Sequence, residues 1–285
     1  MKKQNYLLFQ LSAIMGIILI LFLSSCKKDV MNDDTIPQQN QEFFDFSLGC
    51  ELLPATEYAK IQMAKTPDVI FKVTSLNLNV PPIGNQGGEG SCVAFGTTYA
   101  ARSINWQANH TAAWNYSANI FSPEYVYNQI KLNASCGSGT YVTRGLNLLQ
   151  SEGVCTWASM PYTDQSCSLI PNLTLKTLAA SYKIPSYSTV AINTTSIKSF
   201  LTIGKPIIVA GPVNSDFVNL KNNKILSNFK GHSLGGHCYC VVGYDDTKSA
   251  FKFMNSWGTS WASAGFGYIA YSKIASWWSE AYVIN

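Results

Sequence analysis

The chain has 285 residues, of which 47% are hydrophobic and only 13% are charged, and its formal net charge is +4. A chain of this length and hydrophobic content can bury a sizeable core in one or two domains. Its positive charges form no cluster, so we do not expect nucleic-acid binding, which needs a concentrated basic face.

The N-terminus predicts export. Two lysines precede an apolar run from Tyr6 to Leu23, and Ser24-Ser25-Cys26 follows. This order is similar to a bacterial lipoprotein signal, in which residues 1–25 are removed and Cys26 carries a lipid. An uncleaved anchor is the alternative, because about 18 apolar residues can just span a bilayer. We expect an exported protein, held by a lipid on Cys26 to a bacterial membrane, in the periplasm or at the cell surface.

Export suggests that some of the other cysteines form disulfides, because the compartment is oxidising. Four cysteines lie in loop-like surroundings and allow three connectivities, which the sequence leaves open: Cys50, Cys136, Cys155 and Cys167. Cys238 and Cys240 lie on one predicted strand and are interpreted as small strand residues. A metal site is not expected, because the chain has no Cys-x2-Cys pair and His232 is isolated.

Residues 26–66 are polar and then mixed in character, which predicts a tether. Residues 67–285 follow as the main domain, and its first part is mainly helical. Capping and stop residues indicate four helices: Cys92 to about Asn109, a helix starting at Ser122-Pro123, Thr140 to Gln150 with a stop at Gly153, and Thr195 to Ile203 with a stop at Gly204.

The second part of the domain is rich in predicted strands. Apolar and β-branched runs indicate five of them: Ile207–Ala210, His237–Gly243, Ala250–Met254, Phe266–Tyr271 and Ala281–Ile284. The second and third form a hairpin across Asp245-Asp246. A helical half followed by a β-rich half predicts an α+β fold with a cleft between the halves.

The stretch from Gln86 to Cys92 joins a glycine-rich loop to the first predicted helix. A cysteine at a helix N-terminus lies beside unpaired N–H groups, which favour the thiolate. Gln86 can place its side-chain amide beside the sulfur as an oxyanion donor. A buried and inert Cys92 is the alternative interpretation.

Two later stretches supply groups that thiol chemistry requires. His237 begins an apolar strand, and Asn255-Ser256-Trp257-Gly258-Thr259 follows the next strand. A histidine base with an asparagine that orients its imidazole is what a cysteine nucleophile needs. His232 is a rival base, but no apolar strand follows it directly. The alternative for Asn255 is a turn asparagine before a core tryptophan.

In their order along the chain, Gln-x5-Cys, His and Asn-Ser-Trp-Gly-Thr resemble the papain and cathepsin family of cysteine peptidases. The resemblance extends from Pro67 to the C-terminus. It implies a two-lobed fold, with a helical lobe at about 82–180, an antiparallel β-barrel-like lobe at about 181–285, and the active-site cleft between them. Residues 26–66 would then be either the tether or a short propeptide-like segment.

The resemblance also implies the chemistry. An endopeptidase of this family would attack peptide or protein substrates with a Cys92 thiolate paired to a His237 imidazolium, through an acyl-enzyme. Asn255 would orient the imidazole, and Gln86 would line the oxyanion hole. We expect no cofactor, no metal and a monomer. Substrate contacts are implied for Ser138, Gly139, Tyr141, Ala210, Gly235 and Trp257, and Trp257 would also shield the Asn255 hydrogen bond.

The sequence departs from the family pattern near the nucleophile. Glu89 stands three residues before Cys92, where the family has a disulfide cysteine, and Val93 replaces a tryptophan. Cys136 resembles the usual partner of that missing cysteine and would be free to pair elsewhere, with Cys167 as a candidate. Two other functions remain open: a cell-wall peptide hydrolase or transpeptidase, and a catalytically silent peptide-binding protein on the same fold.

Overall fold

The structure is a computed structural model that describes residues 46–110 and 112–285. The predicted signal sequence and the lipid-bearing Cys26 lie outside these residues. Within the described ranges, no helix is both long enough and apolar enough to cross a membrane.

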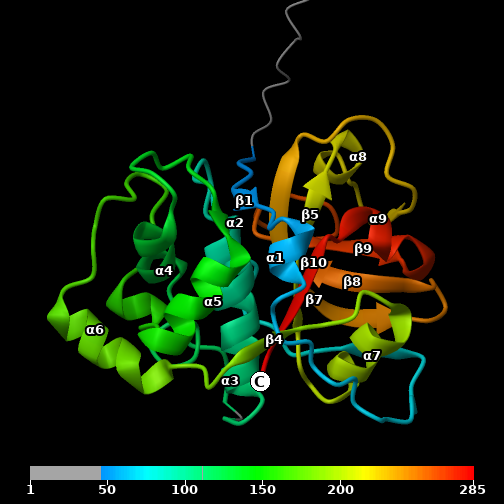
Figure 1. Cartoon of the computed structure of the whole chain (residues 1–285), viewed down its shortest axis with the longest axis horizontal. Coiled ribbons are helices and arrows are strands. Elements are labelled where there is room, and N and C mark those ends of the chain that lie inside the picture. Colours follow the sequence, from blue (N-terminus) through cyan, green and yellow to red (C-terminus); the bar gives the residue numbers. More distant parts are fainter. Residues whose placement is uncertain (1–45, 111) are drawn as a thin grey trace, which may run out of the picture. The chain divides into compact units, whose positions relative to one another are not determined.

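A buried helix begins at Cys92, as predicted, and forms the spine of the helical side (Figure 1). It has three consecutive parts: α2 (Cys92–Ala94), η1 (Phe95–Arg102), which has π-helical hydrogen bonds, and α3 (Ser103–Gln107). Around it lie α4 (Pro123–Ile130), α5 (Val142–Ser151), α6 (Leu173–Ala179) and the short helices η2 (Trp157–Ser159) and η3 (Ala180–Tyr182). All residues from Cys92 to Ile104 are buried.

Local sequence signals explain where α4 begins but not where α5 begins. Ser122 caps α4, because its Oγ accepts a hydrogen bond from Tyr125 N at 3.1 Å and Pro123 takes the first helical position. Helix α5 was predicted from Thr140 but begins at Val142. Thr140 and Tyr141 instead form strand β3, which pairs in parallel with β1 (Cys50–Glu51). A tertiary contact therefore overrides the helical signal of these two residues.

The other side of the domain is an eight-stranded sheet. Its path is β4-β10-β5-β7-β8-β9-β6, and β2 adds to β7. The strands are β2 (Ser75–Asn77), β4 (Tyr187–Thr189), β5 (Ile207–Val213), β6 (Ile225–Leu226), β7 (Gly235–Asp245), β8 (Ala250–Met254), β9 (Phe266–Ala270) and β10 (Glu280–Ile284). All five predicted strands are present. Neighbours pair antiparallel except β6 and β9, and among the described strands β4 and β6 do not pair to close a barrel.

Five short helices complete the domain: α1 (Ala55–Tyr58), α7 (Thr194–Thr202), α8 (Ser215–Val218), η4 (Tyr271–Lys273) and α9 (Ile274–Trp277). Helix α7 was predicted, and Gly204, at a φ of +80°, follows its end. Strand β7 links two core clusters, because Cys238 and Cys240 pack with the central helix while Tyr239 and Val241 pack within the sheet side. The imidazole-bearing strand is thus held on both faces.

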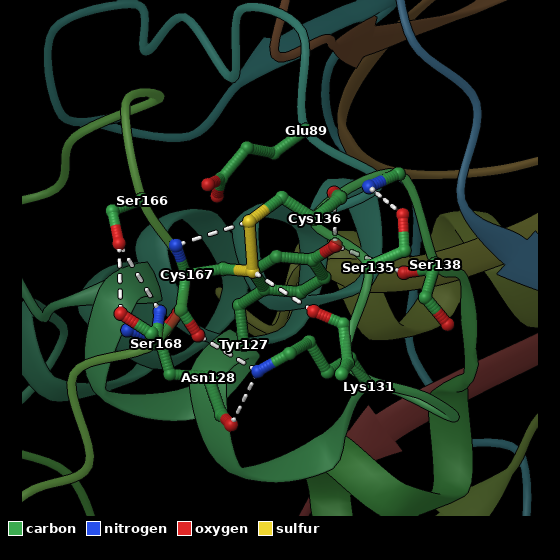
Figure 2. Close-up of a disulfide and its surroundings, with 12 residues drawn as sticks. Glu89, Tyr127, Asn128, Lys131, Ser135, Cys136, Ser138, Ser166, Cys167 and Ser168 are labelled. Carbon is green, nitrogen blue, oxygen red and sulfur yellow. Dashed lines mark hydrogen bonds between the residues drawn. A yellow bond between two sulfur atoms is a disulfide. The ribbon is translucent and has the colours of Figure 1, made fainter.

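The cysteines are now assigned. Cys136 and Cys167 form a disulfide (Figure 2), as the resemblance suggested. The other described cysteines are free and buried: Cys50, Cys92, Cys155, Cys238 and Cys240. No disulfide therefore joins the loop of residues 86–92, which we call the nucleophile loop because it carries the candidate nucleophile Cys92, to the loop that carries Cys136.

Candidate active site

Cys92 is fully buried at the first turn of the central helix. Burial raises the pKa of its thiol to about 11, although hydrogen bonds with the backbone at Cys238 and Gly49 act in the opposite direction. Desolvation penalises the thiolate more than the helix end favours it. In this structure the candidate nucleophile is therefore a neutral thiol.

His237 lies on β7 with Asn255 beside it, as predicted. The imidazole Nε2 and Asn255 Oδ1 are 2.7 Å apart, and the ring stacks on Trp257 with 4.6 Å between centroids. Because the amide oxygen accepts, Nε2 carries the proton and Nδ1 is the basic nitrogen. Burial lowers the pKa of His237 to about 4, and the Asn255 hydrogen bond only partly opposes this.

The expected hydrogen bond between Cys92 and His237 is not made in this structure. Nδ1 of His237 has no hydrogen-bond partner among the described residues. The Cys92 thiol lies instead against the backbone of Cys238, the residue that follows His237, and against the backbone of Gly49. Sulfur and imidazole thus belong to one buried site, and both are neutral.

Gln86 is fully buried and joins the two sides of the domain. Its Oε1 accepts from Ser256 Oγ at 2.6 Å, and its backbone N–H donates to Ser256 O at 2.8 Å. Its Nε2 donates to Glu89 O at 2.9 Å and to Ser47 O at 3.0 Å. The amide that we expected to hold an oxyanion therefore already holds a carbonyl oxygen of the chain itself.

Ser47, one of the two residues whose carbonyl oxygen accepts from Gln86 Nε2, belongs to residues 46–53, which we call the N-terminal segment. Phe46 stacks on Trp257 with 4.7 Å between centroids and 8° between planes, so Trp257 has Phe46 and His237 as ring partners. Gly49 approaches the nucleophile loop so closely that a Cβ on it would lie 2.0 Å from Gly90 O. The segment thus packs on Trp257, holds the Gln86 amide and lies against the backbone that leads to Cys92.

Both sides of the domain anchor the N-terminal segment. On the helical side, Thr140 N donates to Gly49 O at 3.0 Å, next to the β1–β3 pairing. On the sheet side, Leu53 N donates to Glu280 Oε1 at 2.5 Å. Tyr58, just beyond, exchanges two 3.0 Å hydrogen bonds with the backbone of Ala281. Figure 1 shows β1 and α1, in blue, between the helices and the sheet.

Four of the six residues implied for substrate binding contact the N-terminal segment. Gly139 faces Gly49 O, Tyr141 is in register with Glu51, and Gly235 faces the Leu48 side chain. Trp257 lies beneath Phe46. Ala210 is buried on β5 opposite Glu280, and Ser138 O accepts from Tyr127 OH at 2.9 Å.

Sequence reasoning missed three contributors. Ser256, which fixes Gln86, was visible in the Asn-Ser-Trp motif but had no role assigned. Glu280 is buried on β10, and burial raises its pKa against hydrogen bonds from Tyr282 and Leu53. The placement of the N-terminal segment had no sequence signal, because its partners at Trp257 and Glu280 lie more than 200 residues further along the chain.

Known proteins share this sequence pattern and architecture. A family pattern described as papain family cysteine protease matches residues 70–282. Cathepsin B-like CP2 of Giardia intestinalis is 27% identical over 197 residues, which are 66% of this chain and 63% of that protein. Cathepsin K of Mus musculus is 25% identical over 209 residues, 68% of this chain and 57% of that protein. The aligned part of the chain is thus less than two thirds of these relatives' length.

Solved structures share the fold. Xylellain, a cysteine protease from Xylella fastidiosa, superposes with a TM-score of 0.69 at 22% identity, over 85% of this chain and 96% of that one. The bromelain protease from Ananas comosus, in complex with the E64 inhibitor, gives 0.61 at 21% identity, over 75% and 99%. The two-sided α+β architecture described above is therefore a papain-like fold.

Proposed function

The chain belongs to the papain family of cysteine proteases, and from this premise we propose that it is a cysteine endopeptidase that hydrolyses peptide bonds through an acyl-enzyme. The observation that carries the proposal is the 2.7 Å contact between His237 Nε2 and Asn255 Oδ1. It commits one ring nitrogen to the amide and leaves Nδ1 as a base for a thiol.

In the proposed reaction, Cys92 Sγ attacks the substrate carbonyl carbon after its proton passes to His237 Nδ1. The developing oxyanion accepts hydrogen bonds from Gln86 Nε2 and from the Cys92 backbone N–H. The imidazolium then protonates the leaving amine as the C–N bond breaks, and a thioester remains. Water, deprotonated by the imidazole, attacks the thioester and releases the acid and the free thiol.

We further propose that the structure is a latent form. Substrate needs the surface that residues 46–53 cover, and the carbonyl of Ser47 takes the place of a substrate carbonyl on Gln86 Nε2. When the N-terminal segment leaves, water reaches the site and the cost of burying charge falls. The pKa of Cys92 would then fall and that of His237 would rise, so that the thiolate–imidazolium pair can form.

The test of the activity is a peptide-library cleavage profile of the full chain beside its Cys92→Ala form. We expect the wild-type chain to cleave internal peptide bonds, slowly because the N-terminal segment must first leave, and the variant to cleave none. The E64 inhibitor, which is bound to the bromelain protease in the solved complex, should abolish the wild-type signal. Cleavage that persists in Cys92→Ala would contradict the assignment of the nucleophile.

Export and lipid anchoring at Cys26 remain part of the proposal. The apolar run with its following Ser24-Ser25-Cys26 supports them. The Cys136–Cys167 disulfide is also consistent with an oxidising compartment. Labelling of producing cells with a radioactive fatty acid should mark the wild-type protein and leave a Cys26→Ala form unmarked. An unlabelled wild-type protein would contradict the lipid anchor.

A further inference from the structure

Glu89 is a buried acid in the nucleophile loop, at a position where the family has a cysteine. Its side chain is 1% exposed, and Figure 2 shows it beside the Cys136–Cys167 disulfide. A carboxylate oxygen of Glu89 and the two sulfurs lie within 4.8 Å of one another. The sulfurs are bonded to each other and offer no thiolate to a metal, so the acid needs another explanation.

The contacts around the Tyr162 hydroxyl favour a proton on Glu89. Tyr162 Oη lies 2.7 Å from Gln86 O, 2.7 Å from Ser91 Oγ and 3.2 Å from Glu89 Oε2. The hydroxyl has one proton, and the nearer carbonyl of Gln86 can only accept it. With its proton on that nearer carbonyl, Oη can bond Glu89 only by accepting, and Glu89 can donate only as a carboxylic acid. An ionised Glu89 instead needs the Tyr162 hydroxyl as its donor.

The other oxygen of Glu89 leads to the same conclusion. Oε1 is buried and has no hydrogen-bond partner among the described residues. An ionised carboxylate with a bare, buried oxygen is costly, whereas a neutral acid tolerates it much better. The position therefore suits the protonated form.

A second buried acid, Glu124, is in the opposite situation. Its Oε1 accepts from Asn128 Nδ2 at 2.8 Å, and its Oε2 accepts from Thr163 N at 3.2 Å. Both donors are N–H groups, which favour a carboxylate. Burial raises the pKa of Glu124, but these hydrogen bonds and Lys131 oppose the rise. Of the two neighbouring acids, Glu124 is suited to hold the charge and Glu89 the proton.

The charged and titratable groups around Glu89 come from several elements. Glu124 and Tyr127 lie on α4, Tyr162 and Asp164 lie in the loop after η2, and Lys131 follows α4. Burial, followed by the charges of Glu124 and Asp164, raises the pKa of Glu89 to about 7, against Lys131 and against the hydrogen bond that Tyr162 can donate to the ionised form. The proton is therefore lost close to neutral pH.

We propose that Glu89 is a positioning residue, and that its proton holds the loop of residues 86–92 in the geometry that peptide hydrolysis needs. This rests on the proposed function, because the loop carries Gln86 and Cys92. Glu89 acts through its neighbours: its backbone O accepts from Gln86 Nε2 at 2.9 Å, and its acid proton completes the Tyr162 network that also holds Ser91. When Glu89 ionises, its carboxylate draws the single Tyr162 hydroxyl proton away from Gln86 O, and the loop loosens.

The first test is the pH dependence of kcat/KM for peptide hydrolysis by the full chain. We expect kcat/KM to fall about tenfold as the pH rises through 7, since small displacements of catalytic groups have effects of this size or larger. Glu89→Gln keeps a neutral donor at every pH, so this fall should disappear. Glu124→Gln is the matched control: it removes a neighbouring negative charge, so the fall should stay and move to lower pH.

The second test needs no peptidase activity, and so it separates this proposal from the proposed function. In the full chain labelled with 13C at glutamate Cδ, one carboxyl resonance should titrate near pH 7. It should vanish in Glu89→Gln and move to lower pH in Glu124→Gln. If every carboxyl of the folded wild-type chain titrates below about pH 5, the usual range for an acid, the proposal is overturned. A fall in kcat/KM that is unchanged in Glu89→Gln overturns it as well.

Discussion

The two sides of the active site are held in different ways. The imidazole side is a strand inside a sheet, where His237 packs against the rings of Trp257 and Phe217 and makes one polar contact, to Asn255. The nucleophile side is a loop with little regular structure, and it depends on a dense set of hydrogen bonds through Gln86 and Tyr162. Packing fixes the first side, whereas polar partners and their protons fix the second.

Burial also shifts the pKa values of the titratable groups on the two sides in opposite directions. His237 is a base whose pKa is lowered by burial, and Glu89 is an acid whose pKa is raised by burial. Both are therefore kept neutral. Low pH destabilises the folded imidazole side because it protonates and charges His237. High pH destabilises the nucleophile side because it ionises Glu89. Both groups are therefore neutral between about pH 4 and pH 7.

Removing the base should have the largest effect on the imidazole side. We expect His237→Ala to lower kcat/KM for peptide hydrolysis by about 10⁴-fold or more, because nothing else can take the thiol proton. The matched control is His232→Ala, since His232 is exposed five residues away, and it should retain wild-type activity. The reverse order of the two variants would show that the wrong histidine has been assigned.

Removing the oxyanion donor should have the next largest effect, on the nucleophile side. Gln86→Ala should lower kcat by about 10²–10³, the usual cost of losing one such donor. Ser256→Ala leaves the donor in place but removes the 2.6 Å hydrogen bond that fixes it, so its loss of activity should be smaller. Equal losses in the two variants would mean that Gln86 acts only as a structural link between the two sides.

The N-terminal segment bridges the two sides and should be easier to displace than either. Leu53→Pro removes the N–H that donates to the buried Glu280, so we expect iodoacetamide to modify Cys92 about tenfold faster, in line with the loss of one hydrogen bond. Leu53→Ala keeps the N–H and serves as the control. If both variants react at the wild-type rate, the Glu280 contact does not hold the segment in place.

The smallest expected effect is on stability: titration of His237 and of Glu89 should change Tm by a few degrees, in opposite directions with pH. The pKa of His237 falls from 6.5 to about 4 on folding, so the unfolded chain binds more protons in that interval. Stability from this group is present above pH 6.5 and is lost as the pH falls towards 4. Glu89, with a pKa raised from 4.5 to about 7, contributes stability below pH 4.5 that is lost as the pH rises through 7.

Paired thermal melts check these signs. The difference in Tm between wild type and His237→Gln should shrink with acid between pH 6.5 and 4. The difference between wild type and Glu89→Gln should shrink as the pH rises through 7. Parallel curves at all pH values would contradict both signs.

The imidazole side could be predicted from the sequence because its signals are local. The strand that starts near His237, the hairpin to β8 and the Asn-Ser-Trp-Gly-Thr stretch are contiguous patterns, and the structure places all of them as predicted. The sequence left the disulfide connectivity open, and the resemblance offered Cys167 only as a candidate partner for Cys136, which the structure confirms.

The nucleophile side could be predicted only in part. Cys92 at the start of a helix is a local signal, but the covering by residues 46–53 depends on contacts with Trp257 and Glu280, which are remote in the sequence. Thr140 and Tyr141 were predicted as helix because their pairing with Cys50 and Glu51 is equally remote. The proton on Glu89 depends on where Tyr162 places its hydroxyl, and no residue spacing encodes that.

The most direct test of the account is to locate the reactive thiol by mass spectrometry after E64 treatment of the full chain and of Leu53→Pro. We predict a single adduct on the peptide that contains Cys92, formed slowly in the wild type and faster in the variant. An adduct on Cys50 or Cys155 while Cys92 stays free, in a chain that has lost its peptidase activity, would contradict the account.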